Sequence, residues 1–475
     1  MKRALRWFDY ITINIYWFAL TTRSQVLTPL IVPLLVQRFV GDELKGTYLG
    51  GMRLWALMVA LLVQALVGIL SDRNRSKFGR RRPFIVVGTF LEVGVFLSIA
   101  LIASMEGMKG YWILFGLYII SMISSNIAHG AMQGLIPDLV PLEKRGRFSG
   151  VKAWLELPVP LIFVAFVIAK MVSSGDLWGA IIALILVLLV CMLISLFVPE
   201  KQLEKQPPKL NWKPFLRLLA MTGVFITIIM MMGYLVKMGA QFTSQLSEMT
   251  IYWLTASFAV LGMFAAVLLG VWLSVSISLG GQNGKNKSFT WWVVNRLAFM
   301  VGSTNMAGFV IFFIQERFTE FSGEKAAGPA SSVIMFVGIF ILLTAIPSGW
   351  LADIFGKKKL IMVSGLLAAA GALIIISIPS LDAVRVGGCF VGAAVGLFYS
   401  ASWALGTEIV PKEQAGKYLG IANLAGAGSG AIGAYIGGPI GDSLGYVLLM
   451  AIFGVMFFIS IFALLGIKPV KVETA

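Results

Sequence analysis

Charged residues are scarce in this sequence of 475 residues, of which only 13% are Asp, Glu, Lys or Arg and 58% are hydrophobic. Soluble globular domains carry roughly 25% charged residues, so the composition excludes an ordinary soluble protein. Only two cysteines and one histidine are present, which excludes a disulfide framework and a metal site built from these residue types. We therefore expect no metal, no cofactor and no enzyme active site.

The sequence is instead rich in hydrophobic runs that are long enough to cross a bilayer as helices, which takes about 20 residues each. We predict about fourteen spans, arranged as six, two and six, at residues 10–36, 47–70, 83–104, 111–136, 148–172, 177–198, 215–236, 249–279, 289–314, 330–352, 360–378, 384–407, 419–441 and 445–467. The first run is too long for a signal peptide and is expected to remain as the first helix. This order divides the chain into an N-terminal six-helix bundle at 1–198, a linker with a two-helix hairpin at 199–288, and a C-terminal six-helix bundle at 289–475.

Basic residues gather in alternate loops, for example at 73–82, 144–147, 201–217 and 357–359. Cytoplasmic loops of membrane proteins carry an excess of Lys and Arg, so the net charge of +16 reflects these loops and not a nucleic-acid partner. We expect a multi-pass protein of the cell (inner) membrane, monomeric in the lipid bilayer, with both termini in the cytoplasm.

Two motifs occur twice, once in each six-helix half. Residues 68–83 match 349–359 through a glycine, an aspartate and a basic run, and residues 138–150 match 408–420. Both pairs follow the second and fourth spans of their halves. Parallel halves related by an axis along the membrane normal place a solute site between them, near the midplane.

At these residues the chain resembles the major facilitator superfamily. The stretch 70–84, with Asn126, Gly130, Leu135 and Asp138 of the fourth span, is similar to the sucrose–proton symporters and their glycoside–pentoside–hexuronide relatives. The resemblance implies an all-α major facilitator fold of two six-helix bundles, here with two extra helices. It also implies a secondary active transporter that moves a small solute by alternating access, most simply a sugar or glycoside with a coupling proton.

The repeated carboxylates are expected to act in gating. A carboxylate at a helix end can pair with a nearby arginine, and the resemblance implies that such pairs close the cytoplasmic side in one state and break in the other. The expected gating residues are Asp72, Arg73, Arg80, Asp138, Arg147, Asp353 and Glu408.

A few ionisable residues fall within the spans, where each costs at least ~2.5–3.5 kcal/mol. The resemblance places Arg23 and Arg296 on helices that line the central cavity, and Glu156 and Arg53 on adjoining helices. We expect Arg23 and Arg296 to bind solute, with Glu156 balancing Arg23 or carrying a proton; the alternative is ion pairs that only hold helices together. Glu156 is the preferred partner of Arg23 over Glu92, and Arg53 and Arg296 are near enough to helix ends to snorkel.

Polar and aromatic side chains on the same helices complete the expected solute site: Tyr16, Gln25, Asn126, Gln133, Asn305, Tyr399 and Trp403. Amides beside aromatic faces suit sugar rings. Two other functions stay open. The arginines, and the lack of an acid between Trp112 and Pro137, favour an exporter or flippase of an anionic or amphipathic solute, while the extra hairpin suits a non-transporting sensor or assembly factor.

Overall fold

The structure is a computed structural model, and it describes residues 6–200, 202, 211–242, 247–279, 287–410 and 415–467. Over these residues the chain forms helices and no strands. Their packing divides the chain into two units. The first contains residues 1–41, 55–215 and 323–331, and the second contains 42–54, 216–322 and 332–475.

Thirteen helical segments among the described residues are long and apolar enough to cross a membrane. They are Asp9–Val40, Lys45–Asp72, Arg82–Ile102, Gly107–Leu139, Glu143–Ser173, Leu177–Ser195, Lys213–Gly239, Met249–Ser278, Lys287–Arg317, Gly323–Phe355, Lys357–Ser377, Leu381–Ile409 and Tyr446–Gly466. One more helix, α18 (Ala415–Leu444), lies at the predicted thirteenth span, and its 30 residues reach about 45 Å. The all-α fold with about fourteen membrane helices is thus confirmed.

Prolines interrupt two spans of the first unit. Proline lacks an N–H donor and displaces the carbonyl four residues earlier, and π-helical turns follow at η1, which contains Pro29, and at η2, which follows Pro158 and Pro160. The elements up to residue 200 are α1 (Asp9–Thr12), α2 (Ile15–Val26), η1 (Leu27–Ile31), α3 (Val32–Val40), α4 (Lys45–Asp72), α5 (Arg82–Ile102), α6 (Gly107–Met132), α7 (Leu135–Leu139), α8 (Leu142–Glu156), α9 (Pro158–Phe163), η2 (Val164–Ile168), α10 (Ala169–Ser173) and α11 (Leu177–Ser195).

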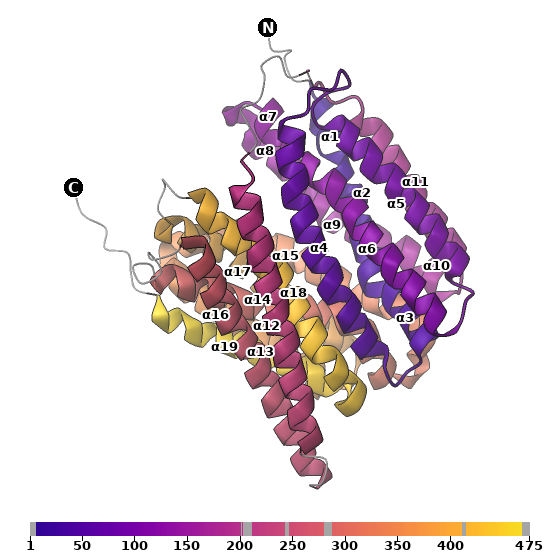
Figure 1. Cartoon of the computed structure of the whole chain (residues 1–475), viewed down its shortest axis with the longest axis vertical. Coiled ribbons are helices and arrows are strands. Elements are labelled where there is room, and N and C mark those ends of the chain that lie inside the picture. The colour runs from indigo at the N-terminus through magenta and orange to yellow at the C-terminus, as the bar shows by residue number, and fades with distance from the viewer. Residues whose placement is uncertain are drawn as a thin grey trace, which may run out of the picture. The chain divides into compact units, whose positions relative to one another are not determined.

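The two predicted extra helices are α12 (Lys213–Phe242) and α13 (Glu248–Leu279), which run side by side (Figure 1). A Cβ on Gly428 of α18 would lie 2.6 Å from the ring of Phe225, so this glycine lets the hairpin pack against α18. The hairpin therefore belongs to the second unit, while the three-part division at residues 199 and 289 stays a prediction. The remaining elements are α14 (Lys287–Arg317), η4 (Thr319–Phe321), η5 (Gly323–Ala326), α15 (Ala327–Phe355), α16 (Lys357–Ser377), α17 (Leu381–Ile409), α19 (Tyr446–Ala463) and η7 (Leu464–Gly466).

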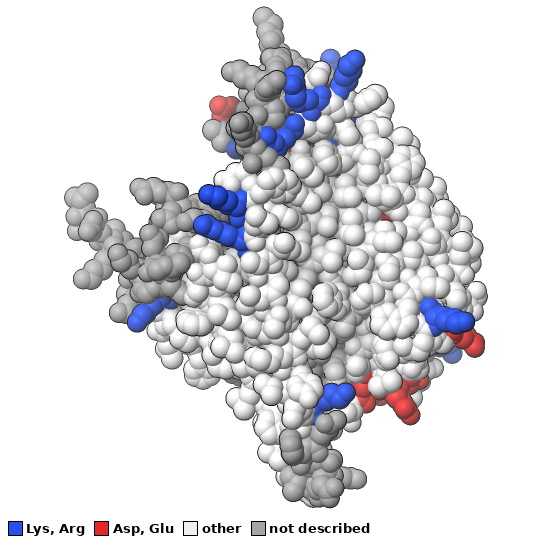
Figure 2. Space-filling view, viewed as in Figure 1, with Lys and Arg blue, Asp and Glu red and all other residues white. Residues whose placement is uncertain are grey.

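Large apolar side chains remain exposed along these helices, among them Trp112 (60%), Leu186 (56%) and Trp272 (56%). The visible face carries few charged side chains (Figure 2). Exposed apolar area on this scale is costly in water, whereas it costs nothing against lipid tails. The chain is accordingly a multi-pass membrane protein.

The first turns of α4 pack against α18 within the second unit. A Cβ on Gly50 would overlap the carbonyl of Ala434, so the two backbones touch there. The Asp442 carboxylate accepts hydrogen bonds from the backbone N–H groups of Gly46 and Thr47, each at 2.7 Å. A carboxylate at a helix N-terminus satisfies free N–H groups and the helix dipole, so α18 caps α4.

Candidate functional site

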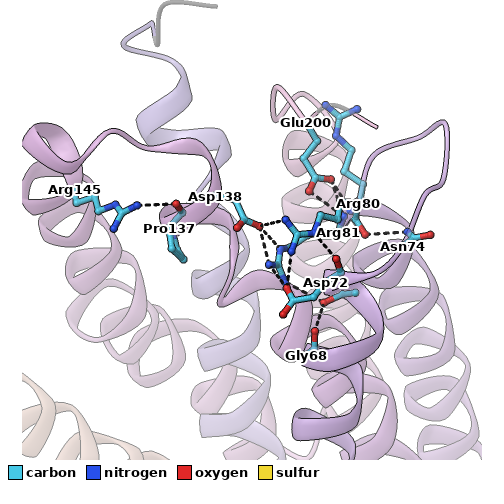
Figure 3. Close-up of polar contacts among 11 residues, drawn as sticks. Gly68, Asp72, Asn74, Arg80, Arg81, Pro137, Asp138, Arg145 and Glu200 are labelled. Atoms are coloured by element: carbon cyan, nitrogen blue, oxygen red, sulfur yellow. Dashed lines mark hydrogen bonds and ion pairs between the residues drawn. The ribbon is translucent and has the colours of Figure 1, made fainter. Parts of the chain in front are cut away.

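The end of α4 carries an ion-pair cluster, here named the Arg81 cluster, that consists of Asp72, Arg80, Arg81 and Asp138 (Figure 3). Arg81 is 5% exposed, and its Nη2 lies 2.6 Å from Asp72 Oδ1 and 2.7 Å from Asp138 Oδ2. Arg80 is more exposed and lies 2.9 Å from Asp72. Within the first unit, these ion pairs connect the end of α4, the residues just before α5, and α7.

Sequence reasoning missed Glu200, which lies beside this cluster (Figure 3). Its carboxylate accepts hydrogen bonds from the backbone N–H groups of Arg81 at 2.9 Å and Arg82 at 3.0 Å, and so caps α5. The sequence also gave no indication that Arg81 is the central arginine of the cluster. The basic run before Pro83 indicates a helix start that needs an acceptor, but no local pattern points to a residue so distant in the sequence.

The second half repeats part of this arrangement. Lys357, at the start of α16, pairs with Glu408 near the end of α17, as Arg81 pairs with Asp138. Asp353 is exposed and has no hydrogen-bond or ion-pair partner in the described part of the chain. Arg147 is exposed too. Residues 411–414 of the second motif lie outside the described residues, and the gating role of all these side chains stays a prediction.

The predicted pairing of Arg23 with Glu156 is wrong. Arg23 Nε lies 2.7 Å from Glu92 Oε1, and both side chains are less than 5% exposed. Ser121 and Ser124 of α6 donate hydrogen bonds to the same carboxylate. Glu156 instead lies 3.3 Å from Lys152, one turn earlier on its own helix. Sequence position alone did not show that α5 presents Glu92 to α2.

Three expected solute-binding residues are buried and make hydrogen bonds inside the protein. The hydroxyl of Tyr16 lies 2.6 Å from that of Thr89. Asn305 donates to the carbonyl of Ser429 at 3.0 Å, which links α14 to α18. Asn126 donates to a carbonyl of its own helix. Their roles in binding stay predictions, but each side chain already makes at least one hydrogen bond inside the protein.

A polar cluster with partly exposed side chains lies in the first unit. Lys152 Nζ is 3.8 Å from the ring centroid of Trp17, and its partner Glu156 is 36% exposed. His129 packs edge-on against the same indole at 5.2 Å, and Gln133 lies 3.3 Å from His129. Two expected residues, Gln133 and Glu156, are thus brought together, whereas Gln25 is half-exposed with no hydrogen bond in the described chain.

Lys152 and Gln64 are members of this cluster that the sequence did not single out. Gln64 of α4 lies 3.4 Å from His129, so α2, α4, α6 and α8 each contribute a side chain to the cluster. The sequence feature that could have pointed to Lys152 is that this lysine lies within the predicted span 148–172. The described residues hold no group of three His, Cys, Asp or Glu side chains suited to a metal ion.

A second cluster lies in the second unit around Arg296. The guanidinium carbon is 4.5 Å from the ring centroid of Trp403 and 5.2 Å from that of Tyr399, both on α17. Arg296 is only 4% exposed, and its Nε and Nη1 have no hydrogen-bond partner among the described residues. Stacking engages the faces of the guanidinium and leaves its in-plane donors available. The expectation that Arg296 and Arg53 snorkel is wrong, since Arg53 is 3% exposed.

Arg23 and Arg296 lie on the first helix of their respective halves, yet their surroundings differ. Arg23 is neutralised by Glu92, whereas no carboxylate pairs with Arg296 in the described chain. The repeat aligns Glu92 with Ala369, because Gly79 aligns with Gly356. Arg23 is therefore engaged in an internal ion pair, whereas Arg296 keeps two donors without a partner among the described residues. The solute-binding role of both stays a prediction.

Comparison with known proteins agrees with the family resemblance of the sequence motifs. The sequence model of the Major Facilitator Superfamily matches residues 15–319 and 291–475. The sucrose transport protein SUC3 of Arabidopsis thaliana is 25% identical over 186 residues, which are 30% of this chain and 29% of that protein. The lactose permease of Lactobacillus helveticus is 27% identical over 177 residues, which are 33% of this chain and 27% of that protein. The matches thus span less than a third of these relatives.

Solved structures share the fold at low sequence identity. A D-xylose–proton symporter has a TM-score of 0.64 at 17% identity, covering 97% of this chain and 98% of its own. The nucleoside transporter NupG has a TM-score of 0.62 at 14% identity, covering 98% and 100%. A POT family transporter in complex with 5-aminolevulinic acid reaches 0.65 at 12%, covering 96% and 94%. These likenesses concern the fold alone.

Proposed function

The chain belongs to the major facilitator superfamily and is a transporter, and we propose that it carries a sugar or glycoside together with a proton. The sucrose and lactose transporters among its relatives support a sugar. The observation that carries the proposal is the cluster of Arg296, Tyr399 and Trp403.

The chemistry of this cluster suits a polar ring. Aromatic faces pack against the C–H faces of a sugar, while guanidinium N–H groups donate to its oxygens in a fixed planar fork. Two of these donors in Arg296 are buried without a partner. Burying a donor without an acceptor costs ~1–3 kcal/mol. A ligand oxygen that accepts a hydrogen bond from such a donor is therefore bound more tightly than an oxygen at an exposed arginine.

Glu156 is the best candidate for the coupling proton. Two carboxylates lie near the middle of described spans, Glu92 and Glu156. Glu92 is 2% exposed and accepts hydrogen bonds from Arg23, Ser121 and Ser124, whereas Glu156 is 36% exposed with one contact, at 3.3 Å. Only an accessible carboxylate can exchange its proton with water at each transport cycle, which favours Glu156.

A thermal-shift screen of the purified protein against sugars and glycosides tests the solute assignment. We expect a sugar to raise the melting temperature of the wild type and to have no such effect on Arg296→Gln. Arg296→Lys should restore little, because lysine lacks the planar fork. The control is Arg385→Gln, which removes a half-buried arginine of α17 that pairs with Asp382, and it should leave the shift unchanged. An unchanged shift in Arg296→Gln would reject the site.

A second candidate is export or flipping of an anionic or amphipathic solute. The unbalanced charge of Arg296 favours an anion. An apolar cavity of about 60 Å³ further along α14, lined by residues such as Ala307, Val310, Val337 and Val391, would take a short alkyl group. Efflux from loaded proteoliposomes, with no uptake of sugars, would favour this candidate over the first.

A further inference from the structure

A small apolar cavity lies inside the second unit, among α14, α15, α16, α17 and α19. Its volume is about 60 Å³, and aliphatic side chains such as Met306, Val310, Val391 and Met450 line it. Ser303 supplies the one hydroxyl among the lining residues, and no charged side chain takes part. A cavity with so few polar groups holds water poorly and suits an apolar ligand.

Helix α14 is exposed only beside this cavity along its middle. The structure describes residues 292–314 in full, and within them only Ser303, Thr304 and Ala307 are not buried. Two of these three, Ser303 and Ala307, line the cavity. The opening in the surface of α14 is therefore the mouth of the cavity.

The cavity and the Arg296 cluster lie along the same face of α14. Ser303 and Ala307 follow Arg296 by seven and eleven residues, and both spacings return to one helical face. At about 1.5 Å per residue they lie ~10 and ~16 Å further along the helix axis. On α17, Gly388 of the cavity precedes Tyr399 of the cluster by eleven residues, again on one face. Along both helices the cavity thus lies two to three turns from the cluster, by the same rough geometry.

We infer that this cavity binds the aglycone of the solute, and that the solute is a glycoside with a short unbranched alkyl chain. The inference rests on the proposed binding of a sugar at Arg296. The sugar ring lies against Tyr399 and Trp403, where the guanidinium donates to its oxygens. The alkyl chain extends along α14, past Ser303, into the cavity. Binding changes no covalent bond.

The chemistry of the lining selects the alkyl chain. A second sugar ring at this place would bury several hydroxyls beside a single hydroxyl partner, Ser303, and unpaired buried hydroxyls are costly. Met306 and Met450 are unbranched and flexible, so they adapt to a chain. A chain also restores the dispersion contacts that side chains lose around a cavity. The cavity therefore favours an alkyl glycoside over a disaccharide.

The test measures equilibrium binding of methyl, butyl and hexyl β-D-glucosides, and of the corresponding β-D-galactosides. The full chain is used in lipid nanodiscs, and empty nanodiscs correct for partition into lipid. Each methylene that enters the cavity should tighten binding about fourfold, which corresponds to ~0.8 kcal/mol. In the wild type we expect the hexyl glycoside of the preferred sugar to bind more than about tenfold more tightly than the methyl glycoside. Arg296→Gln should weaken both by a similar factor, because they share the sugar site.

Three variants assign the effect of chain length to the cavity. Ala307→Leu narrows the mouth, so the hexyl glycoside should bind no more tightly than the methyl glycoside. Val391→Ala only removes atoms from the lining and should raise the hexyl-to-methyl ratio of affinities, which tests the cavity even where Ala307→Leu fails to fold. The control is Ala370→Leu, the same change at an exposed alanine of α16 outside the cavity, and it should behave as the wild type.

The possible failures are distinguishable. Equal affinities of the methyl and hexyl glycosides in the wild type overturn the inference but leave a sugar at Arg296 standing. A chain-length effect that persists in folded Ala307→Leu, or a ratio that is unchanged in Val391→Ala, overturns it too, since the chain then binds elsewhere. Binding of none of these glycosides overturns both the inference and the proposed sugar site.

Discussion

The Glu92 carboxylate balances a guanidinium that has almost no contact with solvent. Removing one partner of a buried pair leaves an uncompensated charge and typically costs 3–5 kcal/mol. We expect Arg23→Gln and Glu92→Gln each to lower the free energy of unfolding by ~3 kcal/mol. The double variant Arg23→Gln with Glu92→Gln should recover much of this loss, as measured by unfolding in detergent.

A surface pair supplies the control for this cycle. Arg38 and Glu324 are 43% and 34% exposed at 2.7 Å, and exposed pairs contribute about 0–1 kcal/mol. Arg38→Gln should therefore change stability little. Additive losses in the double variant, or recovery when Arg23→Gln is combined with Glu156→Gln, would contradict the observed pairing.

Adjacent glycines on α4 offer a matched comparison at the scale of helix packing. A Cβ on Gly50 would overlap the carbonyl of Ala434 on α18, whereas a Cβ on Gly51 would meet nothing within 4 Å. We expect Gly50→Ala to cost about 1–3 kcal/mol through overpacking. Gly51→Ala should be neutral or stabilising by up to ~1 kcal/mol, because alanine favours the helix. Equal melting temperatures of the two variants would argue against this packing.

The spans themselves were predictable from the sequence. Long apolar runs such as 47–70 and 384–407 mark helices that the structure places at Lys45–Asp72 and Leu381–Ile409. In lipid a single spanning segment must pair its backbone N–H and C=O groups with one another, so a long apolar run is enough to predict a helix. The repeated motifs predicted ion pairs at Asp72 and Asp353. Asp72 does pair with Arg80 and Arg81, whereas Asp353 has no partner in the described part of the chain.

The contacts between spans were not predictable to the same degree. Glu92 and Glu156 are both single acids in apolar helices, and nothing local shows which one faces Arg23. The rotation of each helix, and breaks such as the one after Pro158, decide this in three dimensions. Glu200 was missed for the same reason, since its partners are distant in sequence.

The Arg81 cluster holds residues that we expect to act in gating, which is a property of the whole molecule. Asp72 lies at the end of its span, and we expect Asp72→Asn to slow transport while changing equilibrium solute affinity by less than about tenfold. Asp353→Asn, at the corresponding but exposed residue, should have a smaller effect on rate. Weaker binding with an unchanged rate in Asp72→Asn would indicate a solute-binding role instead.

Orientation in the membrane is a further property of the whole chain. The basic loops predict both termini on the cytoplasmic side. In a chain whose two native cysteines are replaced by serine, Gly284→Cys should react with impermeant reagents from the cytoplasm and Glu324→Cys from outside. Labelling of both positions from the same side would refute this topology.

The most direct measurement of the central claim is solute uptake into proteoliposomes with and without an imposed pH gradient. The panel should include sucrose, lactose, xylose and glucuronate, each radiolabelled. We predict that at least one sugar accumulates above its external concentration only when protons flow in with it, and that Arg296→Gln abolishes this accumulation. Uptake equal to that of empty liposomes for every sugar, or accumulation that ignores the gradient, would contradict proton-coupled sugar transport.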